Sequence, residues 1–364
     1  MSSQNPTQTS DAAAAPAEVS ASMSTTVETV RETVSTARTT PVLEVEGLTK
    51  HFPVSGGPFP WSQKKTLHAV DDVSFSLCPG KVTALVGESG SGKSTVARLL
   101  ARLYPPTSGT IRFRGEDILE HSSHSDLMKY RADVQMIFQD PFGSLNPVKR
   151  IKHHLARPLK IHHLVPHDKV EERVLELLTI VGLVPAEDFA RKYPHQLSGG
   201  QRQRVSIARG LAVEPDVILA DEPISMLDVS IRMGILNLIL DLKKKDIAFL
   251  YITHDIASAR YVADDILVMY AGQVVEKGET DAVLQNPLHP YTQLLLSAIP
   301  APEKGGEQTR VETRGEAKGV IDPKDECRFV SRCPMAVEAS HCRTPRLVEI
   351  EPNHWVRCHL YPGA

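Results

Sequence analysis

The sequence predicts an α/β fold in which helices cover the faces of a β-sheet, and three observations predict it. Short apolar runs recur along the chain, and Val82–Val86 is largely apolar on both faces, as expected of a buried parallel strand. Helical patterns lie between several of these runs, an alternation typical of α/β sheets. A glycine-rich loop follows Val82–Val86 directly and precedes a helical run. The further apolar runs lie at 134–138, 217–220, 248–253 and 266–270.

Length and composition bound the class of protein. The chain has 364 residues, enough for one large or two medium domains, with 41% hydrophobic and 23% charged residues. A net charge of -3 gives no electrostatic argument for nucleic-acid binding, so no nucleic-acid partner is expected. No stretch approaches the ~18 apolar residues that span a bilayer, and no secretory signal is present. We expect a soluble, intracellular chain whose membrane role comes through a partner.

Shifts in composition divide the chain. Residues 1–41 are rich in Ala, Ser and Thr and cannot bury enough surface to offset chain entropy, so we expect a disordered tail. Arg31 and Arg38 are too few to argue for a transit peptide there. An apolar register begins at Leu43, and residues 301–325 are polar and resemble a linker. The predicted organisation is a tail at 1–41, an α/β domain at 42–300, a linker at 301–325 and a C-terminal region at 326–364.

Residues 150–210 are predicted to form a helical subdomain inserted in the α/β domain. Asp168 followed by Glu171 indicates an N-cap with a capping box. The apolar residues that follow have helical spacing. They are Val170, Val174, Leu177, Leu178 and Val181.

The glycine-rich loop has the pattern of a phosphate loop. Residues 87–94 read Gly-Glu-Ser-Gly-Ser-Gly-Lys-Ser, between a strand and a helix as this pattern requires. The glycines let the backbone fold around phosphates, and backbone N–H groups and the helix N-terminus face the anion. Lys93 should reach the β- and γ-phosphates, and Ser94 should ligate Mg²⁺. The predicted ATP-binding residues of this segment are Gly87, Glu88, Ser89, Gly90, Ser91, Gly92, Lys93, Ser94 and Thr95.

Two adjacent acids follow the apolar run 217–220. Asp221 and Glu222 sit at the C-terminal end of that predicted strand, where ligands of open α/β sheets bind. Asp221 is predicted to hold Mg²⁺, directly or through water. Glu222 is predicted to polarise the attacking water as general base.

A second glycine-containing element precedes a helical run at 205–211. Residues 197–204 read Leu-Ser-Gly-Gly-Gln-Arg-Gln-Arg, so Ser198, Gly199 and Gly200 open a helix with bare N–H groups and a positive dipole end. One nucleotide already has its own phosphate loop. The second anion site makes physical sense if it covers the γ-phosphate of an ATP held by another subunit.

This Leu-Ser-Gly-Gly-Gln element, lying between the phosphate loop and the two acids, resembles the signature of the ABC ATPase superfamily over about residues 43–300. The resemblance implies that Ser198, Gly199, Gly200 and Gln201 act on the nucleotide of a partner subunit. It implies that Gln139, in Ile-Phe-Gln-Asp-Pro, senses Mg²⁺ and contacts a transmembrane partner.

Further residues match the same superfamily. Asp228, in Ser-Met-Leu-Asp, resembles the dimer-contact aspartate, and His254, in Ile-Thr-His-Asp, resembles the switch histidine that contacts the γ-phosphate. The superfamily stacks adenine on an aromatic residue upstream of the phosphate loop. Phe52 is the candidate that we favour, with Phe59 and Trp61 in an insertion nearby.

The sequence also resembles one branch, the ATPase subunits of oligopeptide and dipeptide importers. The shared features include Gly87-Glu88-Ser89-Gly90 and the stretch from Asn286 to Thr292. Relatives in this branch also import nickel or oligosaccharides, so the cargo stays open. The resemblance implies a hetero- or homodimer of ATPases at the cytoplasmic face of the plasma membrane, two transmembrane permease subunits and an extracytoplasmic binding protein. The alternatives are an exporter ATPase and a soluble ABC ATPase acting on nucleic acid or ribosomes.

Four cysteines gather near the C-terminus. Cys327, Cys333, Cys342 and Cys358 are separated by 5, 8 and 15 residues. Four thiolates hold tetrahedral zinc or an iron–sulfur cluster, and these gaps are wider than those of a zinc ribbon. In the importer branch the matching cysteines resemble ligands of a [4Fe–4S] cluster. We therefore expect a cluster, with zinc and no metal as the alternatives.

Overall fold

A computed structural model describes residues 40–54, 65–120, 123–140, 143–297, 320–341 and 343–364. The tail expected at 1–41 lies almost wholly outside the described residues, as do most of the linker expected at 301–325 and Cys342. No helix among the described residues is long and apolar enough to cross a membrane.

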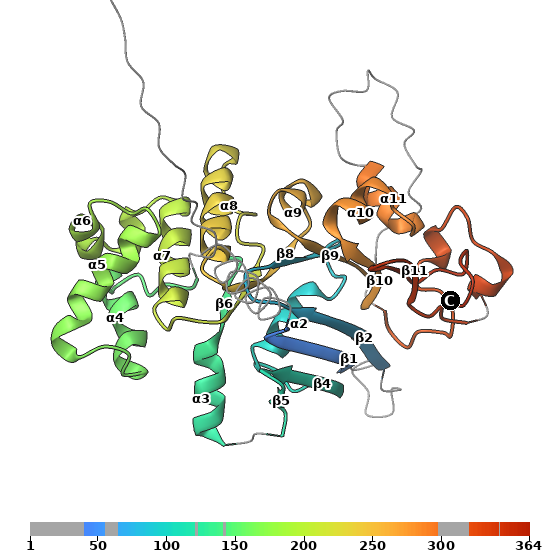
Figure 1. The fold of residues 1–364 in the computed structure, drawn as a ribbon, viewed down its shortest axis with the longest axis horizontal. Helices are drawn as coiled ribbons and strands as arrows, with labels where there is room; N and C mark the ends of the chain where they lie inside the picture. Colours follow the sequence, from blue (N-terminus) through green and yellow to red (C-terminus); the bar gives the residue numbers. More distant parts are fainter. Residues whose placement is uncertain (1–39, 55–64, 121–122, 141–142, 298–319, 342) are drawn as a thin grey trace, which may run out of the picture. The chain divides into compact units, whose positions relative to one another are not determined.

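An eight-stranded sheet forms the centre of the described structure (Figure 1). Its order is β11-β12-β10-β9-β3-β8-β7-β6, and the five strands from β9 to β6 are parallel to one another. Every residue of β3, β7 and β8 is buried, which explains their uninterrupted apolar runs. The bounds are β3 (Val82–Val86), β6 (Val134–Ile137), β7 (Val217–Asp221), β8 (Ala248–Thr253), β9 (Asp265–Tyr270), β10 (Gln273–Glu279), β11 (Val348–Glu351) and β12 (His354–Val356).

Helices and a second sheet cover the two faces of the main sheet. Successive residues of β3 alternate between two apolar cores: Ala84 and Val86 face one, and Leu85 faces the other. The second core lies among the main sheet, α2 (Lys93–Leu100) and an antiparallel sheet of order β2-β1-β4-β5. The bounds of this sheet are β1 (Leu43–Val54), β2 (Lys65–Leu77), β4 (Ser108–Phe113) and β5 (Glu116–Asp117).

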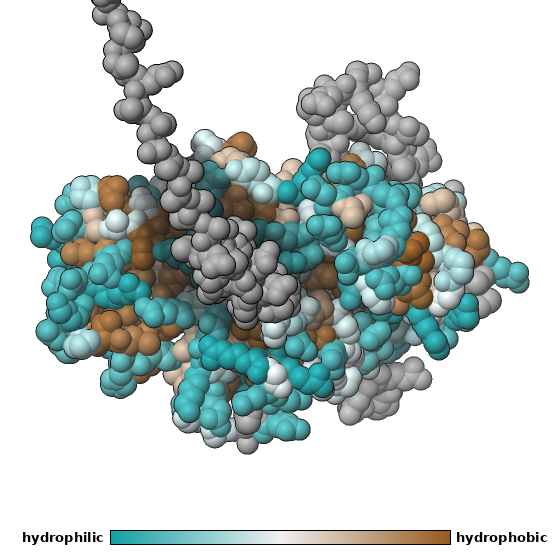
Figure 2. Space-filling model, in the orientation of Figure 1, coloured by the Kyte–Doolittle hydropathy of each residue, from teal (hydrophilic) through white to brown (hydrophobic). Residues whose placement is uncertain are grey.

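The first core lies beneath most of the remaining helices, including those of the helical subdomain expected at 150–210, whereas α3 contributes Tyr130 to the second core. Hydrophobic side chains are visible at several places on the face drawn in Figure 2, including over this subdomain. The bounds are α3 (His124–Asp133), α4 (Ile151–Ile161), α5 (Val170–Ile180), α6 (Ala186–Arg191), α7 (Gly199–Leu211), α8 (Val229–Lys243), α9 (Ile256–Val262), α10 (Thr280–Gln285) and α11 (Pro290–Ser297).

The predicted N-cap at Asp168 is wrong. Residues 167–169 form a 3₁₀ turn, and α5 begins only at Val170 after Lys169, without a side-chain cap. An N-cap residue needs an extended backbone, and Asp168 lies inside the turn instead. The capping box with Glu171 therefore does not form.

The C-terminal region is continuous with the main sheet. Strand β12 pairs antiparallel with β10, and β11 pairs with β12. The buried carboxylate of Glu276 in β10 accepts hydrogen bonds from the backbone N–H groups of Leu288 and His289, and its Oε1 lies 2.8 Å from Nε2 of His354. Ile321, inside the expected linker, forms a β-bridge with Leu67. The boundary expected at 326 is therefore not a boundary in the packing.

Candidate functional site

The phosphate loop connects β3 to α2 and lies close to neighbouring backbone. Gly87, Gly90 and Gly92 all have positive φ angles, of 153°, 80° and 104°. A Cβ atom on Gly87 would lie 2.1 Å from the carbonyl oxygen of Met269, and one on Gly92 would lie 2.2 Å from that of Ala69. Larger residues would push the loop away from β9 and β2, so glycine is required at both positions.

Lys93 is buried at the start of α2 and points back into the loop. Its Nζ donates to the carbonyl oxygens of Gly87 at 2.7 Å and Glu88 at 2.8 Å. Burial lowers the pKa of Lys93, against the opposing effects of Glu222, Asp221 and Glu88. Negative charge placed in the loop would stabilise this ammonium, which is what a polyphosphate supplies.

Asp221 ends β7 and faces the first turn of α2. The Ser94 hydroxyl donates to Oδ1 of Asp221 at 3.0 Å. Burial raises the pKa of Asp221, with a smaller opposing effect from the Ser94 hydrogen bond. A hydroxyl and a carboxylate held together at a phosphate loop are the oxygen ligands that Mg²⁺ takes in such sites.

Three predicted catalytic residues come together at the carboxyl ends of adjacent strands. Oε2 of Glu222 accepts from Nε2 of Gln139 at 3.1 Å, and Oε1 lies 3.2 Å from Nδ1 of His254. These residues follow β7, β6 and β8, which are neighbours in the sheet. Glu222 has a φ of 46°, a left-handed conformation that costs energy in a non-glycine residue. Its N–H donates to the carbonyl oxygen of Ile252 in β8, which helps to hold that conformation.

These groups line one cavity of about 770 Å³. Its walls include most of the predicted phosphate loop together with Gln139, Glu222 and His254. Sequence reasoning missed the other wall residues, which carry no motif of their own. They are Leu67, His68, Ala69, Ala271, Leu295 and Val320.

Phe52 does not lie with the residues that line this cavity. Its ring packs edge-on against Tyr104 at 5.9 Å between centroids, and the Lys50 ammonium lies 5.1 Å from the ring centre. The backbone of Phe52 pairs with Leu67, which does line the cavity. The structure thus places Phe52 beside the site without bringing its ring into it.

The Ser198 element lies outside this cavity, at the N-terminus of α7. Ser198 is exposed, and its hydroxyl and the Gln201 side chain form a reciprocal capping box, so one N–H expected to be bare is capped. A Cβ atom on Gly200 would lie 2.3 Å from Cγ2 of Ile231, so glycine allows α7 to approach α8. Asp228 is exposed at the N-terminus of α8. None of these residues lines the cavity of the chain's own phosphate loop.

The described cysteines of the C-terminal region are close enough to influence one another. Cys327, Cys333 and Cys358 are free thiols, and burial raises the pKa of each, that of Cys358 to about 11. The neighbouring Cys327 and Cys333 contribute to the shift of Cys358. Within the described residues, their sulfur atoms do not form a group lying within 4.8 Å of one another.

Two protein-family models match the sequence. The family described as "ABC transporter" matches residues 70–225, which run from β2 through Glu222. The family described as "Oligopeptide/dipeptide transporter, C-terminal region" matches residues 275–342, from β10 to the third cysteine of the predicted set.

Curated relatives are similar along most of the chain. The oligopeptide transport ATP-binding protein AppF of Bacillus subtilis (strain 168) is 43% identical over 325 residues, covering 88% of this chain and 97% of AppF. The dipeptide transport ATP-binding protein DppF of Escherichia coli (strain K12) is 43% identical over 294 residues, covering 80% of this chain and 86% of DppF.

Solved structures share the fold. The protein cbiO1 of Clostridium perfringens, part of the ABC transporter complex cbiONQ, has a TM-score of 0.58 at 30% identity, covering 68% of this chain and 91% of cbiO1. The ATP-binding cassette MJ0796, in a dimeric post-hydrolysis state with ADP and Pi, has a TM-score of 0.57 at 29% identity. The match covers 65% of this chain and 98% of MJ0796. The predicted α/β ABC ATPase fold is confirmed, and the chain belongs to the ATP-hydrolysing subunits of ABC transporters, in the oligopeptide/dipeptide family.

Proposed function

We propose that this chain powers the import of oligopeptides or dipeptides across the plasma membrane, bound to the cytoplasmic face of two permease subunits. The similarity to AppF along 97% of that protein carries this proposal, because it includes the C-terminal region as well as the ATPase. No feature of the described structure favours the soluble nucleic-acid or ribosome alternative. The vesicle assay described below distinguishes peptide cargo from oligosaccharides or nickel.

ATP hydrolysis requires a second subunit in this proposal. Each ATP lies between one phosphate loop and the element of the other subunit that corresponds to Ser198–Gly200. The exposure of Ser198, outside the chain's own cavity, supports this arrangement. Asp228, exposed at the start of α8, is proposed to contact the partner ATPase, which is either a second copy or a related chain.

Within each site, Glu222 is proposed to orient and polarise the water that attacks the γ-phosphate. Its contacts with Gln139 and His254 fix the carboxylate at the mouth of the cavity, which lowers the reorganisation needed for reaction. Ser94, Asp221 and Gln139 would hold Mg²⁺, which when bound neutralises charge on the phosphates. Lys93 would bind the β- and γ-phosphates.

The permease subunits are proposed to dock beside Gln139. Phe138 and Val148 expose apolar side chains on the segment that follows β6 and leads into the helical subdomain. ATP-driven closure of the dimer would move this surface, and the permeases would follow. The binding protein outside the membrane would act only through the permeases.

A vesicle assay tests the cargo. The chain would be reconstituted in lipid vesicles with the permease and ATPase subunits encoded beside its gene. The binding protein encoded there would be added on the side of the membrane opposite the ATPases. A loaded tripeptide is expected to stimulate ATP hydrolysis, whereas a nickel complex or a β-glucoside leaves the rate at its basal level. Stimulation by the sugar or nickel alone would contradict the peptide assignment.

The four C-terminal cysteines are proposed to hold a [4Fe–4S] cluster. Cys327, Cys333 and Cys358 are free thiols whose charges influence one another, and Cys342 lies outside the described residues. A single tetrahedral zinc needs sulfur atoms about 3.8 Å apart, given Zn–S bonds of about 2.3 Å. The three described sulfur atoms do not form a group within 4.8 Å of one another, so they are not arranged for a single zinc.

Colour and metal content distinguish a [4Fe–4S] cluster from a single zinc ion. Protein purified without oxygen is expected to be brown, with a broad absorbance in the blue and about four iron atoms per chain. Cys333→Ser should lose both colour and iron, and Cys78→Ser, far along the chain, should keep them. Colourless protein carrying one zinc per chain would contradict the cluster.

A further inference from the structure

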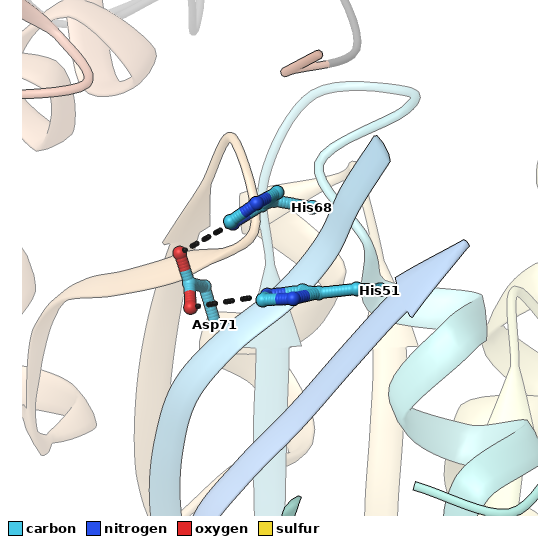
Figure 3. A group of neighbouring side chains, drawn as sticks. All are labelled: His51, His68 and Asp71. Atoms are coloured by element: carbon cyan, nitrogen blue, oxygen red, sulfur yellow. Dashed lines mark hydrogen bonds and ion pairs between the residues drawn. The ribbon is translucent and has the colours of Figure 1, made fainter. Parts of the chain in front are cut away.

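Two histidines and an aspartate form a close group beside the nucleotide cavity (Figure 3). The rings of His51 and His68, on the paired strands β1 and β2, stack with centroids 3.7 Å apart. His51 Nε2 lies 3.5 Å from Oδ1 of Asp71, and His68 Nδ1 lies 3.2 Å from Oδ2. His68 also lines the cavity. These ligands suit a metal ion, but a cation is already there: the guanidinium of Arg328 forms an ion pair with Oδ2 of Asp71.

The phosphate loop receives a second arginine from the same segment. Arg332 donates from both terminal nitrogens to the carboxylate of Glu88, at 2.9 and 3.0 Å, in a bidentate pair. The side chain of Arg332 is only 6% exposed. Hydrogen bonding to Glu88 raises the pKa of Arg332.

Glu88 is consequently held at three points. Arg332 holds its carboxylate, its backbone N–H donates to the hydroxyl of Tyr291 at 2.9 Å, and its carbonyl accepts from Nζ of Lys93. Glu88 directly follows Gly87, where the loop must approach β9. A shift of the Arg332 guanidinium would therefore be transmitted to the path of the loop.

Both arginines lie on one short turn between two cysteines. Arg328 follows Cys327 directly, and Arg332 precedes Cys333 directly. The backbone between them is closed by hydrogen bonds from Val330 N to Cys327 O and from Cys333 N to Val330 O. Phe329, in the same turn, is buried against Tyr270 and Tyr291. The turn therefore connects the thiols rigidly to the two ion pairs.

We propose that Arg328 and Arg332 are positioning residues for ATP, so that metal ligation at Cys327 and Cys333 sets the affinity of the phosphate loop for nucleotide. This inference rests on the proposed nucleotide site and the proposed cysteine-bound metal. Arg328 holds Asp71, which contacts the cavity-lining His68, and Arg332 holds the loop at Glu88. Loss of the metal frees the thiols and loosens the turn. Both ion pairs, Arg328–Asp71 and Arg332–Glu88, are then weakened.

A purely structural role for these arginines makes a different prediction, and Arg357 provides the matched control. Its side chain is 7% exposed, it belongs to the same region, and it pairs with Asp72 at 3.0 Å. It also donates to the carbonyl oxygen of Val274. Arg357 contacts neither Glu88 nor Asp71, so its loss should lower stability without changing nucleotide affinity.

The first experiment measures ATP affinity of the full-length, metal-loaded protein by equilibrium titration with a fluorescent ATP analogue. Arg332→Met is expected to weaken ATP binding about tenfold. This is the size of effect expected from the coupling free energy of two residues in direct contact, here Arg332 and Glu88. Arg332→Lys, which keeps the charge and one contact, should fall between Arg332→Met and wild type. Arg357→Met should stay within about twofold of wild type. Wild-type affinity in Arg332→Met, or an equal loss in Arg357→Met, would overturn the inference.

The second experiment tests the connection to the cysteines. The double variant Cys327→Ser/Cys333→Ser should weaken ATP binding when Arg332 is present and weaken it less in Arg332→Met, where only the Arg328 ion pair remains to be lost. Additive losses would overturn the coupling. Glu88→Gln breaks the same ion pair from the loop side and gives the same comparison if Arg332→Met does not fold. Absence of ATP binding by the wild-type protein would instead refute the nucleotide site itself.

Discussion

Glu222→Gln is expected to reduce ATP turnover about a thousandfold, the size of effect seen when a general base is removed. In the structure, Gln139 and His254 lie 3.1 and 3.2 Å from the carboxylate oxygens of Glu222. The amide keeps the shape of the carboxylate and can still contact both residues. Nucleotide binding should therefore persist. The variant is expected to accumulate as an ATP-bound dimer with its partner ATPase, visible by light scattering with MgATP and absent without it.

The matched control for this variant is Glu279→Gln. Glu279 is exposed at the end of β10 and does not line the cavity. ATP turnover by the Glu279→Gln protein should equal that of the wild-type protein. Normal turnover in Glu222→Gln would show that another group serves as the base, even if the ATP-bound dimer still forms.

Lys93→Ala is expected to weaken ATP binding about a hundredfold, because about 3 kcal/mol of charge-assisted hydrogen bonds to the phosphates is lost. The ammonium is buried, and its pKa is lowered by that burial, so phosphate charge should interact with it strongly. Isothermal titration with ATP and Mg²⁺ measures the change directly.

Lys81 provides the comparison for Lys93, since it lies just before β3 whereas Lys93 lies just after the loop that follows β3. It is exposed and pairs with Asp265 at 3.5 Å. Lys81→Ala should leave ATP affinity within about twofold, as expected of a surface ion pair. Unchanged ATP affinity in Lys93→Ala would contradict the assignment of the phosphate loop.

Local patterns allowed the parallel part of the sheet to be predicted. Strands β3 and β8 have the predicted bounds, because strands buried on both faces produce uninterrupted apolar runs. The catalytic residues were found through motif context, and the structure brings Gln139, Glu222 and His254 together because their strands are neighbours. The roles of these residues stay proposals.

Features that depend on distant pairing could not be predicted. The bridge between Ile321 and Leu67 joins residues far apart in the chain, and polar neighbours made the segment around Ile321 resemble a linker. Arg328 and Arg332 carry no motif, so nothing local indicates that their partners are Asp71 and Glu88. The cap at Asp168 failed because a 3₁₀ turn competes with an N-cap for the same residue.

The continuation of the main sheet into the C-terminal region has a consequence for solubility. Without β12, strand β10 would be an open edge with unpaired N–H and C=O groups, which templates edge-to-edge aggregation. The carboxylate of Glu276 would also lose His354, its partner on β12. Strands β11 and β12 therefore protect the sheet edge, in addition to leading into Cys358 just beyond β12. A chain shortened to the ATPase residues alone would be exposed to self-association through β10.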